Sequence, residues 1–176
     1  ASHRMLGFII NSYGQQEMLV KLLNGKAIDK AKISAAQFSP VYVLLHGVNN
    51  GINENAILSE FSNAFGILPY TLLANPSRDA PGCNDVVVGV SSNSDYSKFV
   101  ASGMKLVSGG TTYRLTRCPT VRAHSSDVSI LTKLINSGLC VVDIATDATT
   151  VSLTVPDRAS ADFLAKTLSP VQCDII

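Results

Sequence analysis

The chain has 176 residues, of which 46% are hydrophobic and 15% are charged. A chain of this length and composition can bury one substantial core or two small ones, so we predict a folded globular protein. The formal net charge of +1 gives no general attraction toward nucleic acid or an anionic membrane. Any nucleic-acid contact must therefore come from local clusters of basic residues.

No apolar run approaches the ~20 residues that a membrane-spanning helix needs, so we expect no membrane partner. The cysteines, Cys83, Cys118, Cys140 and Cys173, are widely spaced and form no C-x-x-C pair. This spacing is typical of reduced, mostly buried thiols, and it predicts an intracellular protein of the nucleus or cytoplasm.

In residues 1–37, the sequence pattern predicts only half of a compact unit. The segment "RMLGFIIN" at 4–11 is typical of a strand, "YGQQEMLVKLLNG" at 13–25 of a helix and "AKISAAQ" at 31–37 of a strand. A β-α-β unit alone has an open edge and an uncovered apolar face. Three completions are open: another segment of this chain, a second subunit, or attachment to the sheet that follows.

Residues 38–119 predict a complete β-α-β-β-α-β unit. Strands are expected at 41–48, 67–74, 85–92 and 111–118, and helices at 54–66 and 95–103. In the first helix, Ile57, Phe61, Ala64 and Phe65 fall on one face and Gly66 ends the helix. The "SGG" segment at 108–110 precedes a strand, which favours a hairpin-like turn over a phosphate-binding loop.

Residues 120–176 predict the same order again, with strands at 120–125, 139–145, 150–155 and 171–176. One helix at 127–138 should bury Val128, Leu131, Leu134 and Ile135, and another at 160–168 should bury three further apolar residues, Ala161, Leu164 and Leu168. The predicted fold class is therefore α+β, with tandem ferredoxin-like domains whose antiparallel sheets carry helices on one face.

Two segments resemble the RNA-recognition motif (RRM) family. In the segment "RMLGFIIN", Arg4, Gly7 and Phe8 match the family octamer K/R-G-F/Y-G/A-F-V-x-F/Y, and the later "LNGK" turn follows as it does in that family. The strand "VYVLLH" is similar to the family's other strand motif, with Tyr42 at the aromatic position. The resemblance implies tandem RRM-like domains and an association with RNA through Phe8 and Tyr42.

The middle unit departs from the family pattern. Its octamer-equivalent strand "CNDVVVGV" places Asp85 and Val87 where stacking aromatics would lie. RNA recognition on such a sheet depends on aromatic faces that stack with unpaired bases. The resemblance is therefore to a degenerate or quasi-RRM, which implies weak or loop-mediated contact with single-stranded RNA, or a protein partner instead.

The segment "YRLTRCPTVR" is the densest basic stretch of the sequence. On a strand, Tyr113 and Arg117 share one face and Arg114 lies on the other. One interpretation is a platform for phosphates and bases, and the other is a solvated edge strand whose charges prevent aggregation. The candidate RNA-binding residues are thus Phe8, Tyr42, Tyr113, Arg114 and Arg117.

A second family shares the ferredoxin-like fold. The loop between Gly47 and Gly51, and the segment "SGLCVVDI" with the later "TVPD", are similar to ACT domains. That resemblance implies a regulatory module that senses a small molecule at a subunit interface. A third hypothesis is a purely protein-binding structural domain of a larger assembly.

Catalysis has no support in the sequence. We find no paired carboxylates, no nucleophile with a base and no metal cluster at a suitable spacing, and His46 and His124 are predicted to be structural. We therefore expect a non-catalytic binding or scaffold module without a cofactor or a metal. Its expected partners are single-stranded RNA and another protein, with a homo-oligomer as an alternative.

Overall fold

The structure is a computed structural model that describes residues 13–28, 31–32, 40–67, 69–125 and 129–176. The predicted strand at 4–11, and with it Phe8, lies outside the described residues. The chain divides into two compact units, Ala1–Ser39 and Pro40–Ile176.

The first unit contains the predicted helix. Helix α1 spans Tyr13–Leu23, and Gly25 then adopts a φ of 80°, a left-handed conformation that suits the end of a helix. Two short strands follow, β1 (Ala27–Ile28) and β2 (Ala31–Lys32), and pair in antiparallel register. Within the part of the chain that the structure describes, these strands pair only with each other.

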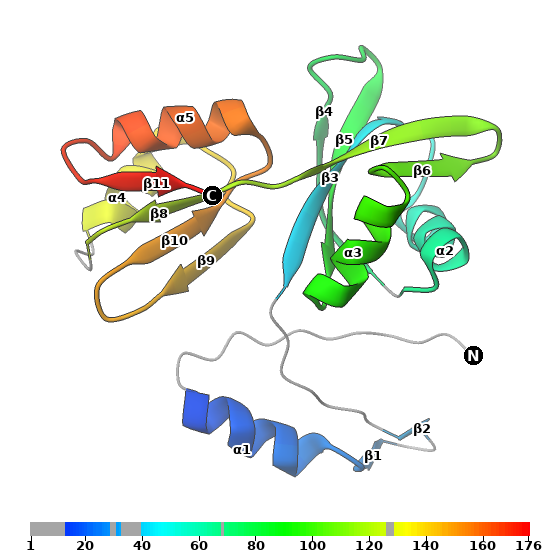
Figure 1. Cartoon of the computed structure of the whole chain (residues 1–176), viewed down its shortest axis with the longest axis horizontal. Helices are drawn as coiled ribbons and strands as arrows, with labels where there is room; N and C mark the ends of the chain where they lie inside the picture. The colour runs from blue at the N-terminus through cyan, green and yellow to red at the C-terminus, as the bar shows by residue number, and fades with distance from the viewer. Residues whose placement is uncertain (1–12, 29–30, 33–39, 68, 126–128) are drawn as a thin grey trace. The chain divides into compact units, whose positions relative to one another are not determined.

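The second unit begins with a five-stranded antiparallel sheet (Figure 1). Its strand order is β4-β5-β3-β7-β6, and without β6 this is the order 4-1-3-2 of a ferredoxin-like sheet. The extra strand β6 pairs with β7 across a hairpin turn at Gly109 and Gly110, where the sequence predicts a turn. The elements are β3 (Val41–Asn49), α2 (Glu54–Phe65), β4 (Tyr70–Pro76), β5 (Cys83–Val90), α3 (Asn93–Ala101), β6 (Lys105–Ser108) and β7 (Thr111–Arg117).

Helices α2 and α3 cover one face of this sheet. Phe61 of α2 and Phe99 of α3 are fully buried, with ring centroids 5.6 Å apart in an edge-to-face arrangement. Gly66 ends α2 in the left-handed conformation, as predicted. Of the four residues predicted on one face of this helix, Ile57 and Phe61 are buried and Phe65 packs against the core, whereas Ala64 is exposed.

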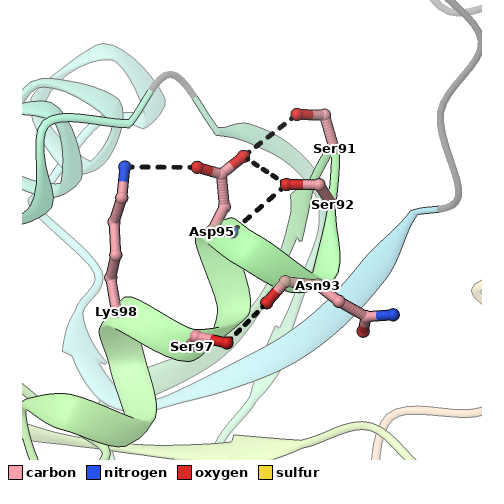
Figure 2. A network of polar contacts seen from close by, with 6 residues as sticks. All are labelled: Ser91, Ser92, Asn93, Asp95, Ser97 and Lys98. Carbon is pink, nitrogen blue, oxygen red and sulfur yellow. Dashed lines mark hydrogen bonds and ion pairs between the residues drawn. The ribbon is translucent and has the colours of Figure 1, made fainter.

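The start of α3 is fixed by a reciprocal cap (Figure 2). The Ser92 hydroxyl accepts a hydrogen bond from the Asp95 amide at 3.2 Å, and the Asp95 carboxylate accepts bonds from the hydroxyls of Ser91 and Ser92 at 3.1 Å. Lys98 lies one turn later and pairs with the same carboxylate at 3.3 Å. The Ser92 hydroxyl thereby satisfies the Asp95 amide, a backbone donor that the first turn of a helix leaves unpaired, and the other bonds hold the capping side chains in place.

A second antiparallel sheet has the order β11-β8-β10-β9, which is again 4-1-3-2. The α+β prediction of tandem ferredoxin-like domains is therefore confirmed. Strand β9 is shorter than the predicted strand at 139–145, because residues 139–142 are not in a strand. The elements are β8 (Thr120–Ala123), α4 (Ser129–Ser137), β9 (Asp143–Thr146), β10 (Val151–Thr154), α5 (Arg158–Thr167) and β11 (Cys173–Ile175).

The second core lies between this sheet and helices α4 and α5. Its fully buried residues include those predicted in α5 and just after it: Ala161, Leu164 and Leu168. In α4, Ile130 and Leu134 are buried, whereas Ile135 is 77% exposed, so the prediction that Ile135 points inward is wrong. Residues 130 and 134 are one turn apart, and residue 135 lies about 100° around the helix from 134. Val128 lies outside the described residues.

The candidate binding face of the five-stranded sheet

Side chains of a strand alternate between the two faces of its sheet. In β3, Val43 and Leu45 belong to the core beneath α2 and α3, so Tyr42, Leu44 and His46 point to the opposite side. We call this opposite side the open face. The resemblance to the RRM family implies that bases would stack on this face.

Half of the open face is apolar. Tyr42, Leu44, Val87 and Cys118 form a buried cluster, against which Leu73 packs from β4. Val142, which immediately precedes β9 of the other sheet, packs on the same cluster. Tyr42 is only 9% exposed, and its hydroxyl donates a hydrogen bond of 3.0 Å to Oδ2 of Asp143.

The connection between the two sheets is short and bonded on both sides. Only Cys118 and Pro119 separate β7 from β8. The Cys118 amide donates to the Tyr42 carbonyl of the first sheet, and the Pro119 carbonyl accepts from the Val155 amide of the second domain. Burial raises the pKa of the Cys118 thiol to about 12, so this cysteine is a packed thiol rather than a reactive thiolate.

The other half of the open face is polar. His46 Nε2 lies 2.8 Å from Oγ1 of Thr116, and His46 Nδ1 lies 3.7 Å from Oδ2 of Asp85. Oδ1 of Asp85 accepts from the Gly47 amide at 2.9 Å, where the pairing of β3 shifts register and Gly47 has a φ of 70°. Burial, then the charge of Arg114, lowers the pKa of His46, so the imidazole is neutral at neutral pH.

Cationic side chains lie beside this polar cluster. Arg114 of β7 pairs directly across from Lys105 of β6, so both side chains lie on the open face. The Arg114 side chain is 62% exposed, and its guanidinium is 3.8 Å from the carboxylate of Asp79, which is more exposed still. An ion pair this long and this solvated contributes little, so Arg114 can exchange it for another anion.

The five predicted residues are not brought together. Tyr42 and Arg114 lie on the open face, whereas Tyr113 packs against the helix-side core. Arg117 also lies on the helix side, with its guanidinium carbon 5.3 Å from the ring centroid of Tyr96. The strand alternation predicted for Tyr113, Arg114 and Arg117 is thus observed. Because of it, the single basic platform is divided between two faces.

Sequence reasoning named His46 as structural and Asp85 as a departure from the family pattern, but it did not predict their contacts or the role of Asp143. His46 and Asp85 contact each other although they are distant in the sequence, and Asp143 comes from the other domain. Their separation along the chain explains why no local motif revealed them. The one available signal was Asp85, an acidic residue directly before the apolar run at 86–88.

The face of the four-stranded sheet opposite α4 and α5 is polar. Thr120 and Thr154 are joined by a hydrogen bond of 3.0 Å, and His124 Nε2 is 2.6 Å from Oδ2 of Asp174. Both His124 and Asp174 are exposed. This face therefore lacks the apolar centre that Tyr42 and its neighbours give the five-stranded sheet.

A depression of about 170 Å³ lies at the end of β3. It adjoins the loop between Gly47 and Gly51, which the resemblance to ACT domains singles out. Its lining includes Asn49, Ile52 and Glu54 from the loop and the start of α2, and Asn84 from β5. The lining combines polar with apolar side chains.

Within the described ranges, no three His, Cys, Asp or Glu side chains are grouped so that they could hold a metal ion. No helix in those ranges is long and apolar enough to cross a membrane. The cysteines in the described ranges are free thiols; Cys118 is buried and the other three are partly exposed.

No protein family model and no curated protein matches the sequence. Among solved structures, the three N-terminal RNA binding domains of the yeast splicing factor Prp24 match with 11% identity and a TM-score of 0.41, over 94% of this chain and 77% of that chain. The regulatory subunit of aspartate kinase from Thermus flavus matches with 13% identity and a TM-score of 0.34, over 77% of this chain and 96% of that chain. The fold assignment rests on the strand order of the two sheets, because both scores lie below 0.5.

Proposed function

We propose that this protein is a non-catalytic, RNA-associated binding module that contacts single-stranded RNA on the open face of its five-stranded sheet. One observation carries the proposal: this face joins an aromatic side chain, Tyr42, to an exposed cationic pair, Lys105 and Arg114. Stacking on an aromatic ring and neutralisation of phosphates are the two interactions that hold unpaired nucleic acid.

The polar cluster supports the same proposal. His46 and Thr116 provide hydrogen-bonding groups between the aromatic ring and the cations. Asp85 opposes phosphate at this position, so we expect micromolar rather than nanomolar affinity. The free thiols fit the intracellular setting, nuclear or cytoplasmic, that belongs to the proposal. The proposal also includes a protein partner or a second copy of the chain. Ile135 on α4 is 77% exposed, and such a partner would cover this apolar side chain.

The alternation along β7 supplies a matched pair of variants. Arg114→Ala removes a cation from the open face, whereas Arg117→Ala removes one from the helix side, three residues away. Fluorescence anisotropy with a randomised single-stranded RNA pool should be measured at two salt concentrations. We expect Arg114→Ala to weaken binding about three- to tenfold and to reduce the salt slope by about 0.7, the value for one phosphate contact on a single strand.

Arg117→Ala should bind like the wild type, because its guanidinium faces α3. Equal losses from the two variants would remove the open face from the proposal. No binding by the wild-type protein at either salt concentration would refute the RNA-associated function itself.

A second candidate function is an ACT-like sensor of a small molecule. The depression beside the loop between Gly47 and Gly51 favours it, because its volume of about 170 Å³ suits a ligand of amino-acid size. Thermal unfolding with each of the twenty amino acids is the test. A raised melting temperature with one of them would support this function through the linkage of binding to stability. A Glu54→Gln variant should then lose the shift, and no shift with any amino acid would dismiss the sensor.

A further inference from the structure

One contact of the C-terminal domain lies where a base would stack. Tyr42 belongs to β3, and its hydroxyl bonds to Asp143 at the start of β9, 101 residues later. Val142, next to Asp143, packs against the same apolar cluster as the Tyr42 ring. We call Val142 and Asp143 together the covering segment.

The covering segment and a stacked base cannot occupy this position together. A base stacks by laying its face on an aromatic ring, which requires that ring face to be accessible. Tyr42 is 9% exposed, and its neighbours Leu44, Val87 and Cys118 are buried as well. The cations of the same face, in contrast, stay accessible, since the Arg114 side chain is 62% exposed.

The covering segment is held by its own sheet rather than by Tyr42 alone. The Val142 amide donates to the Thr154 carbonyl at 2.8 Å, and Asp143 pairs with Thr154 in the β9–β10 ladder. The segment therefore keeps its shape when it leaves Tyr42. Two contacts are lost in that step: the hydrogen bond between Tyr42 and Asp143, and the packing of Val142 on the apolar cluster. Its separation from Tyr42 requires the four-stranded sheet to turn about the two-residue connection at Cys118 and Pro119, without unfolding β9.

We propose that the covering segment is a reversible latch that competes with single-stranded RNA for Tyr42, so that RNA first contacts Arg114 and gains Tyr42 only when the segment is displaced. This inference rests on the proposed function, and it adds that the C-terminal domain regulates the site from within the chain. The apparent affinity of such a site is its intrinsic affinity reduced by the fraction of molecules that are open.

Two variants release the same hydrogen bond from opposite sides. Tyr42→Phe removes the hydroxyl and keeps the aromatic ring. Asp143→Ala removes the acceptor, together with the bond that Asp143 Oδ1 accepts from the Ile144 amide at 2.8 Å. Asp162→Ala is the matched control: it removes a carboxylate of the same domain that pairs with Arg158 on the exposed side of α5. The double variant Tyr42→Phe/Asp143→Ala tests whether the two changes act through one bond.

Each protein is measured in two ways. Anisotropy with the randomised single-stranded RNA pool gives affinity. The rate at which a thiol reagent modifies Cys118, followed by mass spectrometry without RNA, gives opening, because Cys118 is 4% exposed in the cluster under the covering segment. We expect Tyr42→Phe and Asp143→Ala each to label Cys118 faster and to bind RNA about tenfold more tightly, as loss of a charge-assisted hydrogen bond predicts. The double variant should bind no more tightly than the better single variant.

The failures are distinguishable. If both variants label Cys118 faster but bind RNA with wild-type affinity, the latch is overturned and the proposed function stands. The same holds if neither the labelling of Cys118 nor the RNA affinity changes in either variant. If neither the wild type nor the variants bind RNA, the proposed function fails and the latch fails with it. A matching gain of affinity in Asp162→Ala would show a general charge effect and would also overturn the latch.

Discussion

Replacement of Asp85 by Ala should destabilise the five-stranded sheet. Oδ1 of Asp85 accepts the Gly47 amide at 2.9 Å at the irregular point of β3, and the carboxylate side chain is only 16% exposed. A hydrogen bond to a charged group contributes about 1.5–3 kcal/mol. The contact with His46 adds little, because its length is 3.7 Å and the imidazole is neutral at neutral pH. We therefore expect Asp85→Ala to lower the free energy of unfolding by about 2 kcal/mol.

Asp85→Asn should cost about half as much, because the amide keeps an oxygen acceptor and loses only the charge. The assay is urea unfolding at pH 7.5 followed by circular dichroism, in which the midpoint should fall at an unchanged slope. The matched control is Asp174→Ala, which breaks another Asp–His pair, that with His124, on an exposed site. Its expected loss is below about 1 kcal/mol. Equal losses for Asp85→Ala and Asp174→Ala would refute the structural role of the Gly47 bond.

Three further predictions concern stability. Phe61→Ala should lower the free energy of unfolding by about 3–5 kcal/mol in the same urea assay, because the fully buried ring leaves a cavity between α2 and α3. Burial, followed by the charge of Arg114, lowers the pKa of His46, so the unfolded chain binds a proton at this residue more readily than the folded chain does. The free energy of unfolding should therefore fall as pH drops below about 6.5. His46→Gln should abolish that loss between pH 7.5 and 5.5. The Thr149 amide, then neighbouring groups, lowers the pKa of Asp147 to about 2. The melting-temperature advantage of the wild type over Asp147→Ala should therefore persist from neutral pH to about pH 4 and disappear as pH falls through about 2.

The element order was predictable because apolar periodicity is a local property. The strand at 41–48 and the helix at 54–66 are found almost as predicted, since the first is a continuous apolar run, the second has apolar residues at helical spacing, and Gly66 supplies a clear stop. Strand β6 was not predicted; its four residues run from just after the predicted helix at 95–103 into the "SGG" turn at 108–110. The orientation of α4 was misjudged for a related reason: five apolar residues within 128–135 permit two apolar faces, and tertiary packing selects the one with Ile130 and Leu134.

The site was less predictable than the fold. Strand alternation correctly separates Arg114 from Tyr113 and Arg117, but it cannot say which face the helices cover. That choice depends on which residues of β3 and β5 pack under α2 and α3, a property of the folded sheet. The contact between Tyr42 and Asp143 links residues of two different domains, and a single sequence holds no local signal for such a pair.

The departures from the RRM pattern have a consistent physical explanation in this structure. Val87 occupies a position where a stacking aromatic would lie, and it is fully buried in the cluster on which Val142 packs. A larger aromatic ring at that position would have to displace the covering segment, because a filled cluster has no room for the added volume. Asp85, at the other such position, bonds to the Gly47 amide and so fixes the bend in β3. The two residues that depart from the pattern thus each have a structural role: Val87 forms part of the surface on which Val142 packs, and Asp85 holds the irregular part of β3 through the Gly47 amide.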